Sequence, residues 1–401
     1  MTRHHLVFIL VLALLASGCV VVAYDRGDLH ATGALPASFT GSEQREYTLV
    51  FTGDIMPWER MADLLRLHGV GYPYENVLPL LRAADITIGN LEGPVAVKAR
   101  RKDYDYSYKV PPQVLAGLSD AGFDLLNLAS NHSLDCGQEG LSETIANLQA
   151  AGIRHFGAGE DILAAAEPAV FVLNDTRIAF VAAICPETYY DDWDDAQQPG
   201  DYERLMTIMR ERLGAADQRP GMVIATPWTL RRLVQRAAQQ ADLVVANIHC
   251  GIRYNRAPTA RQRQLAQSAV NAGADLVVCH HAHIWQPVEI YHGVPIVYGL
   301  GNFAFGSGNS RADEGMLLRV VLNKGVFTRL DFFPLYTRNR DSDVNYQPRA
   351  LAGGAAASVI ANLGALSREL GANVVFAEGY GRLDLRKRKP ALATPLIPTK
   401  P

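Results

Sequence analysis

Residues Val277 to Pro287 read VVCHHAHIWQP and place three histidines within four positions. The apolar segment ADLVV runs into this stretch, and a short run of this kind is typical of a buried strand. Three imidazoles at the end of such a strand can bind a metal, carry protons or cap the strand. Because side chains two residues apart on a strand point the same way, we expect His281 and His283 to face one site and His280 to point elsewhere.

The same pattern, an apolar run that stops at polar residues and glycine, recurs along the chain. It covers residues 47–56, 84–93, 123–132, 241–251, 274–283 and 294–305. Helical patterns lie between these runs, and one of them begins with Thr226 as a helix cap and Pro227 in the first turn. Strands that alternate with helices predict α/β architecture. After Asn302, two apolar runs around Asn323-Lys324-Gly325 predict a hairpin and a more antiparallel layer of sheet.

Length and composition suit one large globular domain or two ordinary ones, since the chain has 401 residues and is 48% hydrophobic. The formal net charge is −3, and no basic field of the kind that nucleic-acid binding needs is visible. We therefore expect no nucleic-acid partner.

The N-terminus predicts export. A short basic segment precedes an apolar core from Leu6 to Ala16, and small residues lead to Cys19. Residues 1–19 are typical of a lipoprotein signal with Cys19 as the lipidated residue, and an ordinary secretory signal is the alternative. Acyl chains would hold the protein at the surface of a cell-envelope membrane without spanning it. We interpret residues 20–46 as a linker, 47–385 as the domain and 386–401 as a flexible tail.

Polar residues stand at the ends of the predicted strands, where open α/β sheets bind ligands. We expect them to converge on one edge of one sheet. The set comprises Asp54, Asn90, Glu92, Asn131, His132, His249, His281 and His283. Mixed oxygen and nitrogen donors suit one or two divalent ions, with Mn²⁺, Fe or Zn²⁺ favoured. Two such ions can clamp both oxygens of an in-line displacement, which suits phosphoester or other hydrolysis.

Residues around these ligands suggest further roles. His132 is a candidate general acid, and Asp135 either orients its imidazole or forms a turn or helix cap. Arg253, Tyr254 and Arg256 follow His249 and could bind a carboxylate or phosphate, or form a solvated loop. The acidic stretch 189–204 could be a lid, a rim or plain surface. For the remaining cysteines, disulfides compete with metal proximity and simple burial; they are Cys136, Cys185, Cys250 and Cys279.

The chain resembles the poly-γ-glutamate capsule biosynthesis (CapA) family, a branch of the calcineurin-like metallophosphoesterases. The resemblance rests on segments in family order, namely FTGDIM, GNLEGPV, LASNHSLDCG, ANIHCGIRYN and HHAHIWQPVEIYHGVPIVYGLGNFAF, from Phe51 to Phe305. It implies a metallophosphoesterase-like αββα sandwich, in which two mixed β-sheets are flanked by helices.

The resemblance also implies roles for particular residues. Asp54 matches the first metal ligand of the superfamily, but Met56 occupies the place of a histidine, and a thioether is a poor ligand for these ions. Asn90 or Glu92 would replace the bridging aspartate, and a charged bridge favours Glu92. Asn131, His249 and His281 would complete one metal position. Asp54 and His283 would form the other, which could bind weakly, use water or stay empty.

These inferences leave three functions. The first is an enzyme of capsule polymer metabolism, hydrolase-like and metal-dependent, acting with an anionic polymer and a membrane complex for capsule synthesis or export. The second is a phosphoesterase acting on phosphate-containing substrates outside the cytoplasm. The third is a non-catalytic polymer-binding scaffold, which the loss of a ligand at Met56 motivates.

Overall fold

The computed structural model describes residues 45–385, apart from 104–106, 190–198, 308–310 and 343. The predicted signal with Cys19, nearly all of the predicted linker and the predicted tail lie outside the described residues. So does most of the acidic stretch 189–204.

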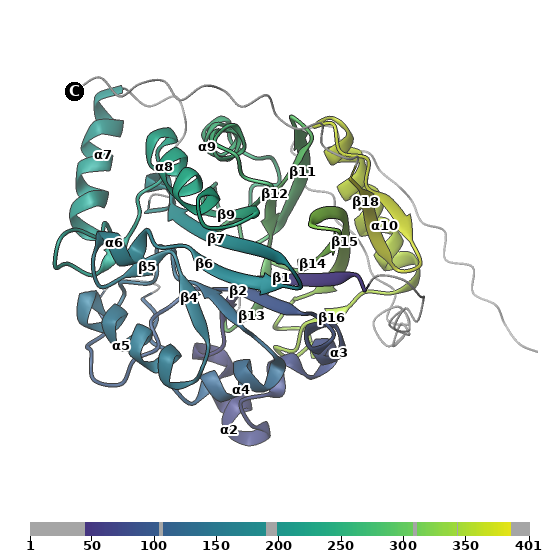
Figure 1. Ribbon diagram of the computed structural model, residues 1–401. Helices are drawn as coiled ribbons and strands as arrows, with labels where there is room; N and C mark the ends of the chain where they lie inside the picture. The colour runs from purple at the N-terminus through teal and green to yellow at the C-terminus, as the bar shows by residue number, and fades with distance from the viewer. Residues whose placement is uncertain (1–44, 104–106, 190–198, 308–310, 343, 386–401) are drawn as a thin grey trace, which may run out of the picture.

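The larger sheet contains ten strands within the described residues and is mixed (Figure 1). Its order is β17 (Val375–Ala377), β18 (Tyr380–Asp384), β15 (Val326–Tyr336), β14 (Glu314–Asn323), β1 (Tyr47–Met56), β2 (Ile86–Leu91), β3 (Leu125–Asn127) and β4 (Arg154–Phe156). β13 (Asn302–Phe305) also pairs with β1, and β16 (Arg349–Ala350) pairs with β15. β1 to β4 run parallel, whereas β14, β15, β18 and β17 pair antiparallel. The predicted hairpin is confirmed, with Lys324 and Gly325 at positive φ in its turn.

The smaller sheet contains six strands among the described residues. Its order is β11 (Trp285–Tyr291), β12 (Val294–Leu300), β10 (Leu276–His280), β9 (Leu243–His249), β7 (Thr176–Ile184) and β6 (Ala169–Leu173). The four central strands are parallel, and both edge strands pair antiparallel. A separate short pair joins β5 (Ala158–Gly159) to β8 (Gly221–Met222).

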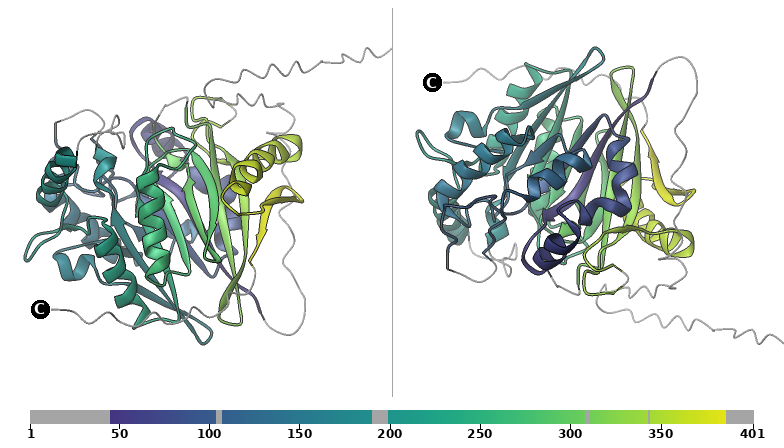
Figure 2. Two further views of the ribbon diagram at one scale, coloured as in Figure 1. Left: turned by 90° about the horizontal axis from the view of Figure 1, so that it is seen from above. Right: turned by 90° about the horizontal axis from the view of Figure 1, so that it is seen from below.

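Helices cover both outer sides of the packed sheets (Figure 2). The smaller sheet carries α8 (Pro227–Ala238) and α9 (Ala260–Asn271), and Thr226 caps α8 as predicted, because its hydroxyl accepts a hydrogen bond from the Thr229 amide. The helices on the opposite side are α2 (Ala62–His68), α3 (Leu78–Arg82), α4 (Val114–Ala121) and α5 (Gly137–Ala150). α10 (Gly353–Arg368) packs against β11, β17 and β18. The remaining helical elements are α6 (Ile162–Ala165), α7 (Pro199–Arg212), η1 (Glu59–Met61), η2 (Tyr72–Val77) and η3 (Pro186–Tyr189).

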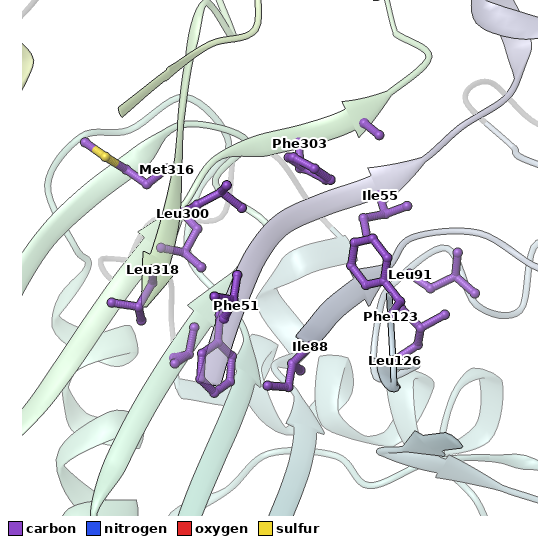
Figure 3. Packing of buried hydrophobic residues seen from close by; sticks show 14 of the residues in the cluster. Phe51, Ile55, Ile88, Leu91, Phe123, Leu126, Leu300, Phe303, Met316 and Leu318 are labelled. Carbon is purple, nitrogen blue, oxygen red and sulfur yellow. The ribbon is translucent and has the colours of Figure 1, made fainter. Parts of the chain in front are cut away.

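The core follows from the alternation of side chains along the buried strands. On β7, Phe180 points between the sheets and its ring centroid lies 6.3 Å from that of Phe51 on β1, whereas Val181 points toward the helices. Figure 3 shows Phe51, Ile55 and Ile88 within the main apolar cluster. The predicted fold class, two mixed sheets packed together and flanked by helices, is confirmed.

One glycine allows the end of β1 to pack closely against the segment that leads into β13. A Cβ atom on Gly53 would lie 1.9 Å from the carbonyl oxygen of Gly301, so only glycine fits this close approach. The next amide, that of Asp54, donates to the same Gly301 oxygen at 2.9 Å. This contact places Asp54 opposite Asn302 in the parallel pair of β1 and β13.

Candidate metal centre

The predicted ligands lie where strand ends of the two sheets face each other. Asp54 and Asn90 belong to β1 and β2 of the larger sheet, and Glu92 directly follows β2. His249 ends β9 of the smaller sheet. The expectation of one edge of one sheet is therefore wrong, because the chain divides its parallel strands between two sheets that pack face to face.

The histidine-rich segment leaves the strand earlier than expected. β10 ends at His280, and both His281 (φ 96°) and His283 (φ 57°) adopt positive φ, which non-glycine residues rarely do. The amide of Tyr254, itself at φ 61°, donates to the Ala282 carbonyl at 2.8 Å and ties this turn to the loop after β9. Backbone strain of this kind clusters at functional sites.

The turn still brings both predicted histidines to the site. Glu92, His249 and His281 form one group whose potential ligand atoms lie within 4.8 Å of one another. Asp54, Glu92 and His283 form a second group by the same measure. Glu92 belongs to both groups, so the buried side chains provide two adjoining candidate metal positions that share one carboxylate.

The environment of Glu92 fits a cation. The residue is fully buried, and neither carboxylate oxygen has a hydrogen-bond partner among the described residues. Burial, followed by the negative charges of Asp54 and Asp135, raises the pKa of Glu92 well above its ordinary value. A buried carboxylate without donors is costly, and a bound cation would offset that cost.

The two histidines of the first group are also suited to metal binding. Burial lowers the pKa of His249 and of His281, which favours the neutral imidazole that ligates metals. The Nδ1 atom of each has no hydrogen-bond partner among the described residues. His249 Nε2 lies 2.8 Å from Asn131 Oδ1, so the structure also brings Asn131 to this position.

Contacts with buried polar side chains hold the Asp54 carboxylate in place. The Asn90 amide donates to Asp54 Oδ1 at 2.9 Å, and the Asn90 oxygen accepts from Asn127 at 2.8 Å. His280 Nδ1 lies 3.2 Å from Asp54 Oδ1, and His283 Nδ1 lies 3.2 Å from Oδ2. Burial alone would raise the pKa of Asp54, but the contacts with His280 and His283 outweigh it and hold the pKa well below its ordinary value.

Two features of the polar side chains around Asp54 differ from expectation. The idea that His280 points elsewhere is wrong, because it faces Asp54 from the inner side of the smaller sheet. Sequence reasoning also missed Asn127 and Asn247, although Asn247 lies two residues before His249 and so shares its face of β9. The Asn247 amide nitrogen lies 3.4 Å from His280 Nε2.

Met56 takes no part in this polar cluster. Its side chain is fully buried within the main apolar core. The position that the resemblance assigns to a histidine is therefore occupied by an apolar packing residue.

His132 lies close to Glu92, the carboxylate that the two candidate groups share. Its Nε2 atom is 4.0 Å from Glu92 Oε1, and its Nδ1 atom is 2.9 Å from Asp135 Oδ2. The same Asp135 oxygen accepts a hydrogen bond from the Tyr108 amide at 2.7 Å. Asp135 is thus placed to orient the imidazole; it does not cap α5, whose N-cap residue is Cys136.

A cavity of about 110 Å³ opens beside these groups. Its lining residues are Tyr108, His132, Arg253, Tyr254, His283, Asn302, Phe305, Ser307 and Arg311. Arg253 and Tyr254 therefore line a cavity next to the candidate metal centre, as does Arg311, which sequence reasoning missed and whose guanidinium lies 4.8 Å from the Tyr254 ring. Arg256 does not line the cavity: it stacks on the Trp285 ring at 3.7 Å and donates to the Trp285 carbonyl.

The four cysteines of the described residues are free and buried. Cys185, Cys250 and Cys279 belong to the apolar layer between the smaller sheet and its helices, and Cys136 packs with Ala96 and Ala99. Of the three alternatives for these residues, the structure shows burial.

Two packed mixed sheets, flanked by helices, with carboxylates and imidazoles at facing strand ends define an α/β sandwich protein with a candidate metal centre. Residues 48–307 match the family described as bacterial capsule synthesis protein PGA_cap, and the chain belongs to this family.

Relatives and solved structures give the following similarities. The chain is 30% identical over 301 residues to the capsule biosynthesis protein CapA of Bacillus anthracis, covering 73% of this chain and 68% of that protein. It is 30% identical over 297 residues to the PGA biosynthesis protein CapA of Bacillus subtilis, covering 71% and 70%. A crystal structure of a 5'-nucleotidase from Candida albicans aligns over 76% of this chain and 54% of its own, with a TM-score of 0.40 and 11% identity.

In the part of the chain that the structure describes, no helix combines the length and apolar character needed to cross a membrane.

Proposed function

We propose that this protein is an exported, lipid-anchored, metal-dependent hydrolase-like enzyme that acts on capsule polymer during poly-γ-glutamate synthesis or export. Family membership and the names of the two Bacillus relatives support the capsule role. The apolar N-terminal segment before Cys19 supports export and anchoring at the cell envelope.

One observation carries the catalytic part of the proposal, namely the buried Glu92 shared by two groups of potential ligands. Asp54 and His283 would hold one divalent ion with Glu92, and His249 and His281 would hold the other, with Asn131 beside them. Bound there, Mn²⁺, Fe²⁺ or Zn²⁺ would supply Lewis acidity and a lowered pKa for bound water.

The protein's own residues supply the remaining parts of a hydrolytic site. Asp135 fixes the ring of His132, so that its Nε2 points toward Glu92 and the cavity, where it can donate a proton to a leaving group. Arg253 and Arg311 line the same cavity and can orient a substrate carboxylate or phosphate. The buried chain of Asn127, Asn90 and His280 keeps Asp54 in place.

Metal content tests the proposal directly. The full-length protein, purified with Mn²⁺, Fe²⁺ or Zn²⁺ and then dialysed, should retain at least one ion per chain. Glu92→Gln should abolish that binding, since it removes the carboxylate common to both positions. Arg231→Gln, on the exposed face of α8, is the control and should bind as the wild type does. Metal below one equivalent under every condition would refute the proposal.

A phosphoesterase acting outside the cytoplasm is the second candidate. The placement of His132 near two cavity arginines favours it, because phosphate esters need a proton donor for the leaving group and cations for the phosphoryl oxygens. A panel of phosphate monoesters and diesters separates the two candidates. Turnover that His132→Ala abolishes supports this one, and no turnover above that variant excludes it.

A non-catalytic scaffold is the third candidate, and the burial of Met56 favours it because one ligand of the usual set is lost. Capsule formation in cells distinguishes it from the other two. The scaffold role predicts that His132→Ala and His281→Ala leave the capsule intact while Cys19→Ala abolishes it.

A further inference from the structure

Three residues that do not line the cavity form one contact cluster, namely Arg256, Trp285 and Glu314. The Arg256 guanidinium stacks on the Trp285 ring at 3.7 Å and donates to the Trp285 carbonyl at 2.7 Å. The Trp285 indole N–H donates to the Glu314 carboxylate at 2.6 Å, and Arg256 pairs with the same carboxylate at 3.8 Å. Trp285 and Glu314 are buried, whereas the Arg256 side chain is partly exposed. Each member therefore contacts the other two.

Each member of this cluster follows a cavity-lining residue of its own segment by two or three positions. The pairs are Arg253 and Arg256, His283 and Trp285, and Arg311 and Glu314. The three segments come from different parts of the chain, since one follows β9 and the others lead into β11 and β14. The cluster therefore joins these segments close to the residues that face the cavity.

Further contacts hold the backbone around the cluster. Gln286 Nε2 donates to the Asn255 carbonyl at 2.8 Å, which ties the loop after β9 to β11. Gly301, at φ 74°, lies between the other two segments. A Cβ atom there would lie 2.8 Å from the Glu314 carbonyl oxygen and 3.0 Å from the Trp285 amide nitrogen. The three segments are therefore packed closely against one another.

A second buried glutamate on β11 offers a comparison. Glu289 accepts a hydrogen bond from the Tyr298 hydroxyl and pairs with Arg263 at 3.1 Å. It thus has an aromatic donor and an arginine partner, as Glu314 has. However, Glu289, Tyr298 and Arg263 all lie more than three positions from any residue that lines the cavity. The same kind of pair therefore occurs once beside the cavity and once away from it.

We propose that Arg256, Trp285 and Glu314 are positioning residues, which hold Arg253 and Arg311 in place to bind an anionic group of the substrate. The inference rests on the proposed function for the anionic nature of that substrate. Arginine recognises a carboxylate or phosphate through a fixed fork of N–H donors, so affinity depends on where the backbone holds the side chain. A loop already held in its binding conformation also loses less entropy when the ligand binds.

Hydrogen–deuterium exchange of the full-length protein tests the positioning itself. Glu314→Gln removes the charge that pairs with Arg256 and keeps an acceptor for the Trp285 indole. We expect faster exchange in residues 252–257, because the loop is held less tightly, and Arg256→Gln should have the same effect. Glu289→Gln is the matched control and should leave exchange of this segment as in the wild type. Unchanged exchange in both cluster variants, or an equal increase in the control, overturns the inference.

Isothermal titration calorimetry with a γ-glutamyl dipeptide, in the presence of Mn²⁺, tests the consequence for binding. Glu314→Gln and Arg256→Gln should each weaken dipeptide affinity about tenfold and leave metal content at the wild-type level. The double variant should lose no more than either single variant, because both act through one set of contacts. Glu289→Gln should bind the dipeptide as the wild type does.

A melting curve verifies that each variant is folded. If Glu314→Gln does not fold, Arg256→Gln decides the question, because its side chain is partly exposed. Full dipeptide affinity in the folded cluster variants, or an equal loss in Glu289→Gln, overturns the inference. So does a wild type that binds metal but no dipeptide, which leaves a metal-dependent enzyme. A wild type that binds the dipeptide but no metal refutes the hydrolase alone, and the same variants still test the cluster.

Discussion

The two faces of the smaller sheet differ sharply where β9 and β10 end. On the outer face, Ile248, Cys250 and Cys279 pack in an apolar layer against α8 and α9. On the inner face of the same strands, His280 lies 3.2 Å from Asp54 of the larger sheet, Asn247 contacts His280, and His249 is grouped with Glu92. Cys279 and His280 are consecutive residues, so the alternation of the strand alone separates the two environments.

The difference shows that one face of the sheet carries residues that stabilise the fold, whereas the other face carries residues of the candidate site. The apolar side chains of the outer face pack together away from water, which lowers the free energy of the folded chain. Along the inner face lie buried polar atoms that have no hydrogen-bond partner among the described residues, including Nδ1 of His249 and, from the larger sheet, both oxygens of Glu92. Such groups destabilise the fold until something binds them, and proteins retain them chiefly where function requires it.

The largest effect should come from the outer face. Leu265 on α9 is fully buried in the apolar layer, and Leu265→Ala should lower the free energy of unfolding by about 2 to 5 kcal/mol through lost burial and the cavity left behind. Urea denaturation measures this change. The folded variant should keep its full metal content, and loss of metal at equal folding would contradict the separation of the two faces.

Glu92→Gln should have the opposite sign in the metal-free protein. Since the pKa of Glu92 is raised, the folded chain retains a proton that the unfolded chain releases, and its stability falls as the pH rises above the ordinary glutamate value of 4.5. Removing the carboxylate should abolish this decline and stabilise the fold by about 1 to 3 kcal/mol at neutral pH. Denaturation across pH in the presence of a chelator measures this change in the free energy of unfolding. A variant no more stable than the wild type at neutral pH would show that the buried Glu92 carboxylate does not destabilise the metal-free fold.

His280→Asn tests the inner face more finely. Loss of the imidazole beside Asp54 should weaken one of two Mn²⁺ positions by about tenfold and leave the other unchanged, because groups behind a ligand set its orientation. A Mn²⁺ titration followed by electron paramagnetic resonance measures both positions. Equal weakening of both, or no change, would show that His280 does not act through Asp54.

Cys279→Ala should have the smallest effect and serves as the control for His280→Asn. The thiol is buried in the outer layer, so its loss should cost about 1 kcal/mol of unfolding free energy or less. The same Mn²⁺ titration should give wild-type affinities. A change in either metal position would mean that the two faces of β10 are coupled.

Local sequence patterns predicted the elements, whereas the arrangement of two packed sheets was predicted only by the family resemblance. Short apolar runs ending at glycine and polar residues located β1, β2, β9 and β10, and the pattern around Thr226 located the start of α8. Local patterns carry this information because side-chain periodicity and capping depend on nearby residues. The division of the parallel strands between two sheets depends on contacts between distant segments, and no local pattern reports it.

The same distinction holds at the candidate site. Strand-end position was enough to select Asp54, Glu92 and His249 as neighbours. His281 joins the site although it directly follows the inward-facing His280, because the backbone turns at the positive φ of His281, and residue spacing does not reveal such a turn.

The pairing of Asp54 with Asn302 has a consequence for how the protein folds. Each of the two candidate metal positions draws on residues from both halves of the domain, and β1 pairs with β13 from the second half. Contacts between such distant parts of a chain slow folding, because loop-closure entropy is lost before the contacts form. A chain that ends before Asn302 therefore lacks β13, which pairs with β1 at Asp54. Both candidate metal positions are therefore complete only once distant parts of the chain have come together.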